Sequence, residues 1–124
     1  MREGDGAAYR FAVTFRLGPG EVDVDPDTFE TTLYRPAAEP GEGGWLFFRD
    51  YLWRGEISDP DHLRAWASEA LGVDVIDIEF RAFECTETEL EELRETIGAE
   101  LATFRAESVQ EAVANYFGSA LEVQ

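Results

Sequence analysis

The balance of charge constrains this chain more than any other feature of its sequence. Its 124 residues include 27 Asp and Glu but only ten basic side chains, all of them arginine, and the formal net charge is −17. Carboxylates stay hydrated and hold cations where water is scarce, whereas at low salt their mutual repulsion opposes a compact state. At about 1 M salt the Debye length is only ~3 Å, so the repulsion is almost fully screened.

This charge pattern predicts a protein of a halophile's cytoplasm, built for concentrated KCl. A GC-rich genome would also deplete lysine codons, but it would not explain the excess of Asp and Glu. Arginine, with its planar group of five donors, can bridge several carboxylates at once. We expect the fold to loosen below about 0.5 M salt, and far-ultraviolet circular dichroism during dialysis into dilute buffer measures this directly.

Length and apolar content predict one globular domain over residues 1–124, with residues 1–7 flexible and residues 36–44 an exposed loop. Apolar residues make up 44% of the chain and include three Trp, four Tyr and nine Phe, which is enough for a core. The start of the chain has no apolar segment of a signal peptide, and no apolar run is long enough to span a membrane. We therefore expect a soluble cytoplasmic protein without membrane contact.

The first half of the chain predicts three strands. Residues 9–17 alternate between apolar and polar side chains, as a half-buried strand does, and a short strand follows near 29–35. Residues 45–57 are the most aromatic segment, and alternation there gives a strand that is apolar on both faces. Such a strand is central and covered, or it lies in a subunit interface.

The second half predicts a helix, a strand and two further helices. Asp59, Pro60 and Gly72 are typical of the two ends of a helix. Residues 73–83 follow as a strand with Ile76, Ile78 and Phe80 inward. Capping-box spacing from Thr86 and from Ser108 starts the last two helices. The expected fold class is α+β, in the order β-β-β-α-β-α-α, with a mostly antiparallel four-stranded sheet and three helices on one face.

The tripeptide Leu52-Trp53-Arg54, in an acidic chain of this length without lysine, resembles the haloarchaeal LWR-salt protein family, which is named for it. The resemblance covers roughly residues 9–123. It implies a salt-adapted archaeal protein of the cytoplasm. It transfers no activity and no catalytic residue, only the tripeptide itself.

The candidate functional surface is the sheet face that three helices leave uncovered. Trp and Arg are frequent in interface hot spots, and the predicted strand places Arg49, Tyr51 and Trp53 on one face. The candidate residues are Arg10, Arg16, Arg49, Tyr51, Trp53 and Arg54. The leading hypothesis is a non-enzymatic module that binds a protein partner, with a second copy of itself as one candidate. The alternative is RNA binding by stacking and phosphate contacts on the same face. A purely structural role for Trp53, at the core edge, stays open beside both.

Other chemical signals in the sequence are weak, and we expect no enzyme, no cofactor and no specific metal site. Asp23, Asp25 and Asp27 have the spacing that opens a calcium loop, but the glycine and the closing glutamate of that loop are missing. One Cys and one His exclude an internal disulfide and a standard zinc site. His62 is interpreted as a surface residue rather than a general base, and Cys85 as an inert thiol rather than a reactive one.

Overall fold

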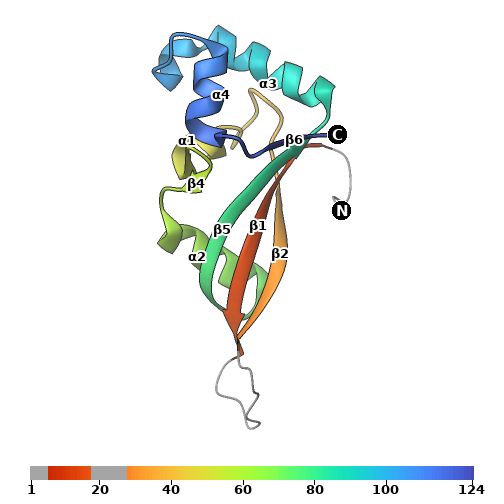
Figure 1. Ribbon diagram of the computed structural model, residues 1–124, viewed down its shortest axis with the longest axis vertical. Helices are drawn as coiled ribbons and strands as arrows, with labels where there is room; N and C mark the ends of the chain where they lie inside the picture. The colour runs from red at the N-terminus through yellow and green to blue at the C-terminus, as the bar shows by residue number, and fades with distance from the viewer. Residues whose placement is uncertain (1–5, 18–27) are drawn as a thin grey trace.

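The computed structural model describes residues 6–17 and 28–124, and a four-stranded sheet runs through it (Figure 1). Across the sheet the strands are β2 (Thr28–Pro36), β1 (Ala8–Arg16), β5 (Asp74–Cys85) and β6 (Leu121–Val123). β1 is antiparallel to both of its neighbours, as expected, whereas β6 runs parallel to β5. The sheet is therefore mixed rather than purely antiparallel.

Alternation along β1 gives the sheet one apolar and one polar face. Tyr9, Phe11 and Val13 are buried, while Arg10 between them lies on the other side. Residues directly opposite each other on paired strands share a face. Phe80 of β5, opposite Phe11, therefore also points into the core.

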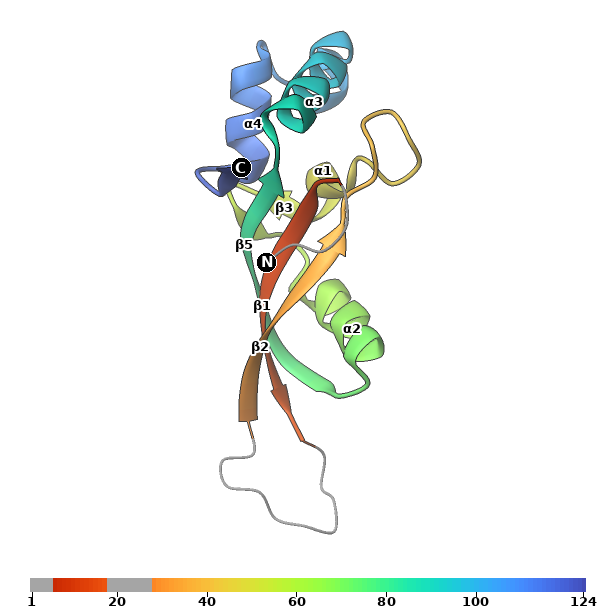
Figure 2. The same cartoon turned by 90° about the vertical axis from the view of Figure 1, so that its right-hand side faces the viewer.

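The described residues form four α-helices and one 3₁₀ helix: α1 (Phe47–Tyr51), α2 (Pro60–Leu71), α3 (Glu87–Ala99), η1 (Leu101–Phe104) and α4 (Val109–Phe117). Figure 1 shows α3 and α4 at one end of the sheet, and α2 lower down beside β5. Figure 2 shows α1 and α2 on the same side of the sheet. Most of the buried side chains form one cluster shared by the sheet and the helices.

The helix starts expected from the sequence are confirmed. The carboxylate of Asp59 accepts a hydrogen bond from the backbone N–H of His62 at 3.2 Å. Thr86 and Glu89 form a capping box with reciprocal bonds of 2.8 and 3.1 Å. Each bond occupies a backbone N–H that the first turn of a helix leaves unpaired. The expected end of α2 is confirmed as well, because Gly72 adopts a left-handed φ of 71°.

Two bulges in β5 change which of its side chains reach the core. Ile76 and Arg81 are extra residues where the register with β1 shifts, and each extra residue reverses the alternation of faces. The prediction of inward side chains is right for Ile78 and Phe80, which are buried, and wrong for Ile76. Val75 takes that place in the core.

Residues 45–57 do not form the third strand of the sheet, so this prediction is wrong. Phe47–Tyr51 is the helix α1, and only β3 (Leu52–Trp53) and β4 (Glu56–Ile57) pair, in a separate two-stranded sheet. Phe48 and Leu52 are four residues apart, a spacing that puts both on one face of a helix. A short apolar run satisfies the helical and the strand period equally.

The observed order of strands and α-helices is β-β-α-β-β-α-β-α-α-β in place of β-β-β-α-β-α-α. The coarse fold class, α+β, is confirmed. The count of three helices is too low by one, because α1 replaces the expected strand. In the part of the chain that the structure describes, no helix has the length and apolar character needed to cross a membrane.

Candidate binding groove

The tripeptide Leu52-Trp53-Arg54 leads into a tight hairpin. β3 and β4 pair directly, which leaves Arg54 and Gly55 as a two-residue loop. Both loop residues have a positive φ, of 53° and 80°, as a type I′ hairpin turn requires at its two central positions. Gly55 adopts this conformation freely, whereas it costs Arg54 roughly 1 kcal/mol or more.

The loop of this hairpin caps the C-terminal end of α4. The backbone N–H of Arg54 donates to the carbonyl oxygen of Asn115 at 2.6 Å, and the N–H of Gly55 donates to that of Tyr116 at 3.0 Å. Backbone N–H groups within residues 118–120 pair with the two other carbonyls of the turn. A helix leaves these last carbonyls without a partner, so the hairpin completes the end of α4.

The contact between the hairpin and α4 is close enough to require glycine on both sides. Gly118 has a φ of 59°, and a Cβ atom there would lie 2.9 Å from the carbonyl oxygen of Arg54. A Cβ atom on Gly55 would lie 3.0 Å from the carbonyl oxygen of Phe117. The backbone of the tripeptide is therefore fixed against the helix.

The side chains of the tripeptide have different surroundings. Leu52 is 1% exposed and belongs to the core, while Trp53 is 48% exposed. The Trp53 ring packs edge-on against Tyr116, with 5.7 Å between centroids. The Arg54 guanidinium lies 5.8 Å from the centroid of the Trp53 ring, within cation–π range. The hairpin thus presents an aromatic ring and a cation on the surface.

A groove of about 520 Å³ opens beside the hairpin. Segments far apart in the sequence line it, from α1, β3, η1 and α4: Arg49, Trp53, Thr103, Phe104, Arg105, Asn115 and Tyr116. Figure 1 shows α1, α3 and α4 at the same end of the molecule. The lining holds two arginines and no carboxylate, although carboxylates outnumber arginines 27 to ten in the chain.

The arginines around the groove have few internal partners. Nε of Arg49 donates to Oδ1 of the neighbouring Asp50 at 3.2 Å, and exposed pairs of this kind stabilise little. Within residues 6–17 and 28–124, Arg54 and Arg105 form no ion pair. They are also the two non-glycine residues of these ranges with a positive φ. Backbone strain of this kind clusters at functional sites.

The six residues predicted for one surface lie in three places. Arg49 and Trp53 line the groove, and Arg54 packs beside Trp53. Tyr51 instead stacks on the ring of His62, with centroids 4.8 Å apart. The prediction that Arg49, Tyr51 and Trp53 share a strand face is therefore wrong, because the first two belong to a helix.

Arg10 and Arg16, the two other predicted residues, lie on the polar face of β1, away from the groove lining. Arg10 joins three strands: its Nη1 donates to Glu84 at 2.8 Å and its Nη2 to Glu122 at 2.5 Å. Glu84 is only 2% exposed and also accepts from Gln124 at 3.3 Å. Partial burial acts to lower the pKa of Arg10, but the two carboxylates outweigh it and raise that pKa.

Sequence reasoning missed Arg105, Asn115 and Tyr116 as site residues. Tyr116 lies in the last helix that the sequence predicts, in α4. Arg105 ends η1 in a left-handed conformation, with a φ of 51°, and no motif in the sequence marks this position. The groove therefore becomes visible only when the segments are assembled.

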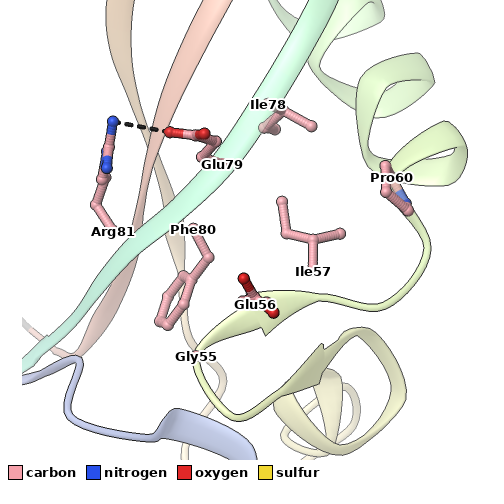
Figure 3. Close-up of a pocket in the computed structure, with 8 residues that line it drawn as sticks. All are labelled: Gly55, Glu56, Ile57, Pro60, Ile78, Glu79, Phe80 and Arg81. Carbon is pink, nitrogen blue, oxygen red and sulfur yellow. Dashed lines mark ion pairs between the residues drawn. The ribbon is translucent and has the colours of Figure 1, made fainter.

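A second hollow, of about 470 Å³, lies between β4, the start of α2 and β5 (Figure 3). Figure 3 shows Ile57, Pro60 and Ile78 around it, and the Arg81–Glu79 ion pair of 2.8 Å on the other side of the β5 ribbon. Glu56 adds a further carboxylate to the lining. This hollow therefore lacks the cationic surplus of the groove.

The remaining sequence signals stay apart from the groove lining. Cys85 is fully buried at the end of β5, and His62 is exposed in the first turn of α2. Among the residues that the structure describes, no three His, Cys, Asp or Glu side chains are placed to hold a metal ion. The Asp23–Asp27 motif lies outside the described residues.

A protein-family model described as LWR-salt protein matches residues 5–124. The chain belongs to the LWR-salt protein family. No curated protein and no solved structure matches it. In this LWR-salt protein the tripeptide has two structural roles. The backbone N–H of Arg54 helps to cap α4, and the side chain of Trp53 lines the groove.

Proposed function

We propose that this LWR-salt protein is a non-enzymatic protein-interaction module of a haloarchaeal cytoplasm, with the groove as its binding surface. The position of Trp53 carries this proposal. It is the most exposed large apolar side chain of the described residues, and it lies in a lining that also contains Arg49, Arg105 and Tyr116. Trp, Tyr and Arg are the side chains that contribute most binding energy at protein interfaces.

The polar face of the sheet is a weaker candidate than the groove. Its register places mostly polar side chains opposite one another across β2, β1 and β5. Glu30, Thr14 and Asp77 form one row, and in the next row Thr32 and Glu79 lie on either side of Ala12. Two of its arginines, Arg10 and Arg81, are already engaged with carboxylates. A surface of this kind offers no aromatic anchor comparable to Trp53.

Concentrated salt favours a groove that combines aromatic rings with arginines. Salt screens long-range attraction between charges but screens partly buried pairs much less, and salting-out ions strengthen the burial of apolar surface. Trp53 and Tyr116 would therefore keep their contribution in a salt-rich cytoplasm. Arg49 and Arg105 would act at short range, where they select the partner.

Native co-purification of the full chain in concentrated KCl tests this function. Mass spectrometry identifies recovered proteins, and sequencing identifies recovered nucleic acid. We expect a discrete protein partner that is retained by the native chain and lost on Trp53→Ala. Val123→Ala is the matched control, because Val123 is also an exposed apolar residue but lies outside the groove lining. Identical recovery with both variants would contradict the proposal.

RNA recovered in a Trp53-dependent manner would favour the alternative function. Contacts to phosphate weaken as salt rises, so RNA binding at high KCl would need bases stacked on Trp53 or Tyr116. Exposure of Trp53 permits this mode. The same experiment therefore separates the two functions, because either a protein or an RNA is no longer recovered with Trp53→Ala.

A further inference from the structure

The groove has the chemistry of a carboxylate-binding site. Its lining contributes the guanidinium groups of Arg49 and Arg105 and the polar side chains of Thr103 and Asn115, with no acidic residue among them. An excess of 27 carboxylates over ten arginines makes such a region unusual in this chain. The groove therefore offers positive charge to a ligand that carries a carboxylate.

The guanidinium donors in this region are largely unused by the protein itself. Arginine carries five N–H donors in a planar group that matches a carboxylate in a bidentate arrangement. Arg49 engages Asp50 through Nε, and in the described part of the chain Arg105 forms no ion pair at all. A carboxylate bound here would not have to displace a buried internal partner.

The aromatic walls require that the ligand also carry an apolar group. The rings of Trp53 and Phe104 both pack edge-on against Tyr116, with centroids 5.7 and 6.1 Å apart. A volume of about 520 Å³ accommodates a few side chains. An acidic side chain beside an apolar one, as in a short peptide segment, satisfies both parts of the lining.

The surroundings of the groove favour a peptide over a nucleic acid. A nucleic acid presents a phosphate at every step and needs a continuous cationic track. Here the exposed side of α3, which leads into η1, carries Glu87, Glu91, Glu92 and Glu95. A peptide with its acidic residue confined to the groove avoids these carboxylates.

We propose that the groove binds a short segment of a partner protein in which a carboxylate lies beside an apolar side chain, with Arg49 and Arg105 holding the carboxylate. This inference rests on the proposed function and names the chemistry of the partner. Trp53 and Tyr116 contact the apolar side chain. Arg54, stacked beside Trp53, adds positive charge at the edge of the site.

Titration with synthetic peptides tests the inference. The probe is a short peptide of alternating Glu and Leu, and its control has Gln in place of every Glu. Tryptophan fluorescence of the full chain reports binding in KCl of about 0.5 M and above. We expect the Gln peptide to bind at least about tenfold more weakly, because it offers no charge-assisted contact to arginine.

Variants connect this binding to the groove. Arg105→Ala should weaken binding of the Glu peptide at least about tenfold, and Arg105→Lys should restore only part of it, because an ammonium group cannot form the bidentate contact. Arg94→Ala is the matched control, since Arg94 is an exposed arginine of α3 outside the groove lining. It should leave the affinity unchanged. Circular dichroism of each variant verifies that the fold is retained.

Either of two titration results would overturn the carboxylate inference: equal binding of the Glu and Gln peptides, or unchanged binding of the Glu peptide by Arg105→Ala. A third result would do so as well, namely self-association of the native chain that Arg105→Ala abolishes. In that case the groove would be occupied by a second copy of the chain. The peptide titration tests the carboxylate inference and the co-purification tests the proposed function, so a negative result in one does not decide the other. A Trp53-dependent protein partner without discrimination between Glu and Gln leaves the proposed function intact and removes only the carboxylate. Loss of Trp53-dependent recovery removes the function itself.

Discussion

The polar face of the sheet and the groove both present arginine, but in opposite surroundings. On the sheet, Arg10 pairs with Glu84 and Glu122, and Arg81 pairs with Glu79. In the groove, Arg105 has no ion pair with any described residue, and the one partner of Arg49 is its exposed neighbour. The first set of arginines is paired with carboxylates on the sheet, and Arg10 also joins strands, whereas the second set has few internal partners among the described residues.

This difference shows that the place of an arginine in the fold, rather than the overall composition, decides what it does in an acidic chain. The residues opposite Arg10 on its two neighbouring strands are Tyr34 and Ala82. Its guanidinium instead reaches Glu84, two residues further along β5, and Glu122 on β6. The groove is built from a hairpin, two helices and η1, whose side chains follow no common register. No carboxylate belongs to the lining in which its two arginines lie.

Replacing Arg10 should have the largest effect on stability. Arg10→Met keeps the apolar stem but removes the Arg10 ion pair from the buried carboxylate of Glu84, which should cost about 3 kcal/mol of unfolding free energy. Arg81→Met, which removes an exposed pair, should change it by less than about 0.5 kcal/mol. Denaturant unfolding at fixed high KCl measures both. Equal losses in the two variants would show that burial of Glu84 is unimportant.

The double variant Arg10→Met with Glu84→Met sharpens this prediction. Replacing both members of a buried pair by apolar residues is often neutral, so most of the lost stability should return. A double variant no more stable than Arg10→Met alone would indicate that Arg10 acts mainly through Glu122.

Adding a methyl group to Gly118 should have the next largest effect. Ala at this position combines a strained positive φ with a Cβ atom 2.9 Å from the carbonyl oxygen of Arg54. We expect the unfolding free energy to fall by about 2 kcal/mol or more. Gly72→Ala is the matched control, because its φ is 71° but no atom lies within 4 Å of the added Cβ. It should cost about 1 kcal/mol. Thermal unfolding compares the two, and equal costs would contradict the close packing of the hairpin on α4.

Alkaline pH should destabilise the contact between the sheet and α1. Burial of Tyr9 raises the pKa of its phenol, against the lowering effects of a hydrogen bond with the backbone of Phe48 and of Arg35. The folded state therefore keeps the proton, and its stabilising contribution is complete below about pH 10, the pKa of an exposed tyrosine. Above that pH it should decline by about 1 kcal/mol per pH unit.

Unfolding free energies between about pH 8 and 11 measure this decline. Tyr9→Phe should make the profile flatter, because the side chain no longer titrates. A profile that is equally steep in the native chain and in Tyr9→Phe would assign the alkaline loss to other groups.

The smallest effect is expected for glycine in place of the two strained arginines. Arg54→Gly and Arg105→Gly relieve a positive φ but give the unfolded chain more freedom, so stability should stay the same or rise by less than about 1 kcal/mol. Peptide binding should nevertheless decrease in Arg105→Gly. Calorimetric unfolding combined with the peptide titration tests this, and a marked loss of stability in Arg105→Gly would mean that this arginine supports the fold.

The sequence predicts well those elements whose signals are local. The alternation of residues 9–17 is present as β1, and the caps at Asp59, Thr86 and Ser108 begin α2, α3 and α4 as expected. Each of these signals needs only its own neighbours in the chain. The strand at 29–35 is likewise present, as β2.

Errors occurred where distant contacts decide the structure. Phe47 and Phe48 fit a strand as well as a helix, and packing on Tyr9 and α4 selects the helix. The bulge at Ile76 depends on pairing with β1. β6 has three residues and forms because β5 offers it a free edge. For the site, the sequence singled out Arg49 and Trp53, whereas Arg105 joins them in the groove lining only through the folding of η1.

An arginine scan with two readouts tests the central claim most directly. Arg10, Arg49, Arg81, Arg94 and Arg105 are each replaced by Ala, and the unfolding free energy and the affinity for the Glu–Leu peptide are measured for every variant at the same KCl concentration. We predict that Arg10→Ala lowers stability without changing affinity, and that Arg49→Ala and Arg105→Ala lower affinity without changing stability. Parallel loss of both quantities, whichever arginine is replaced, would contradict the division between structural and binding arginines.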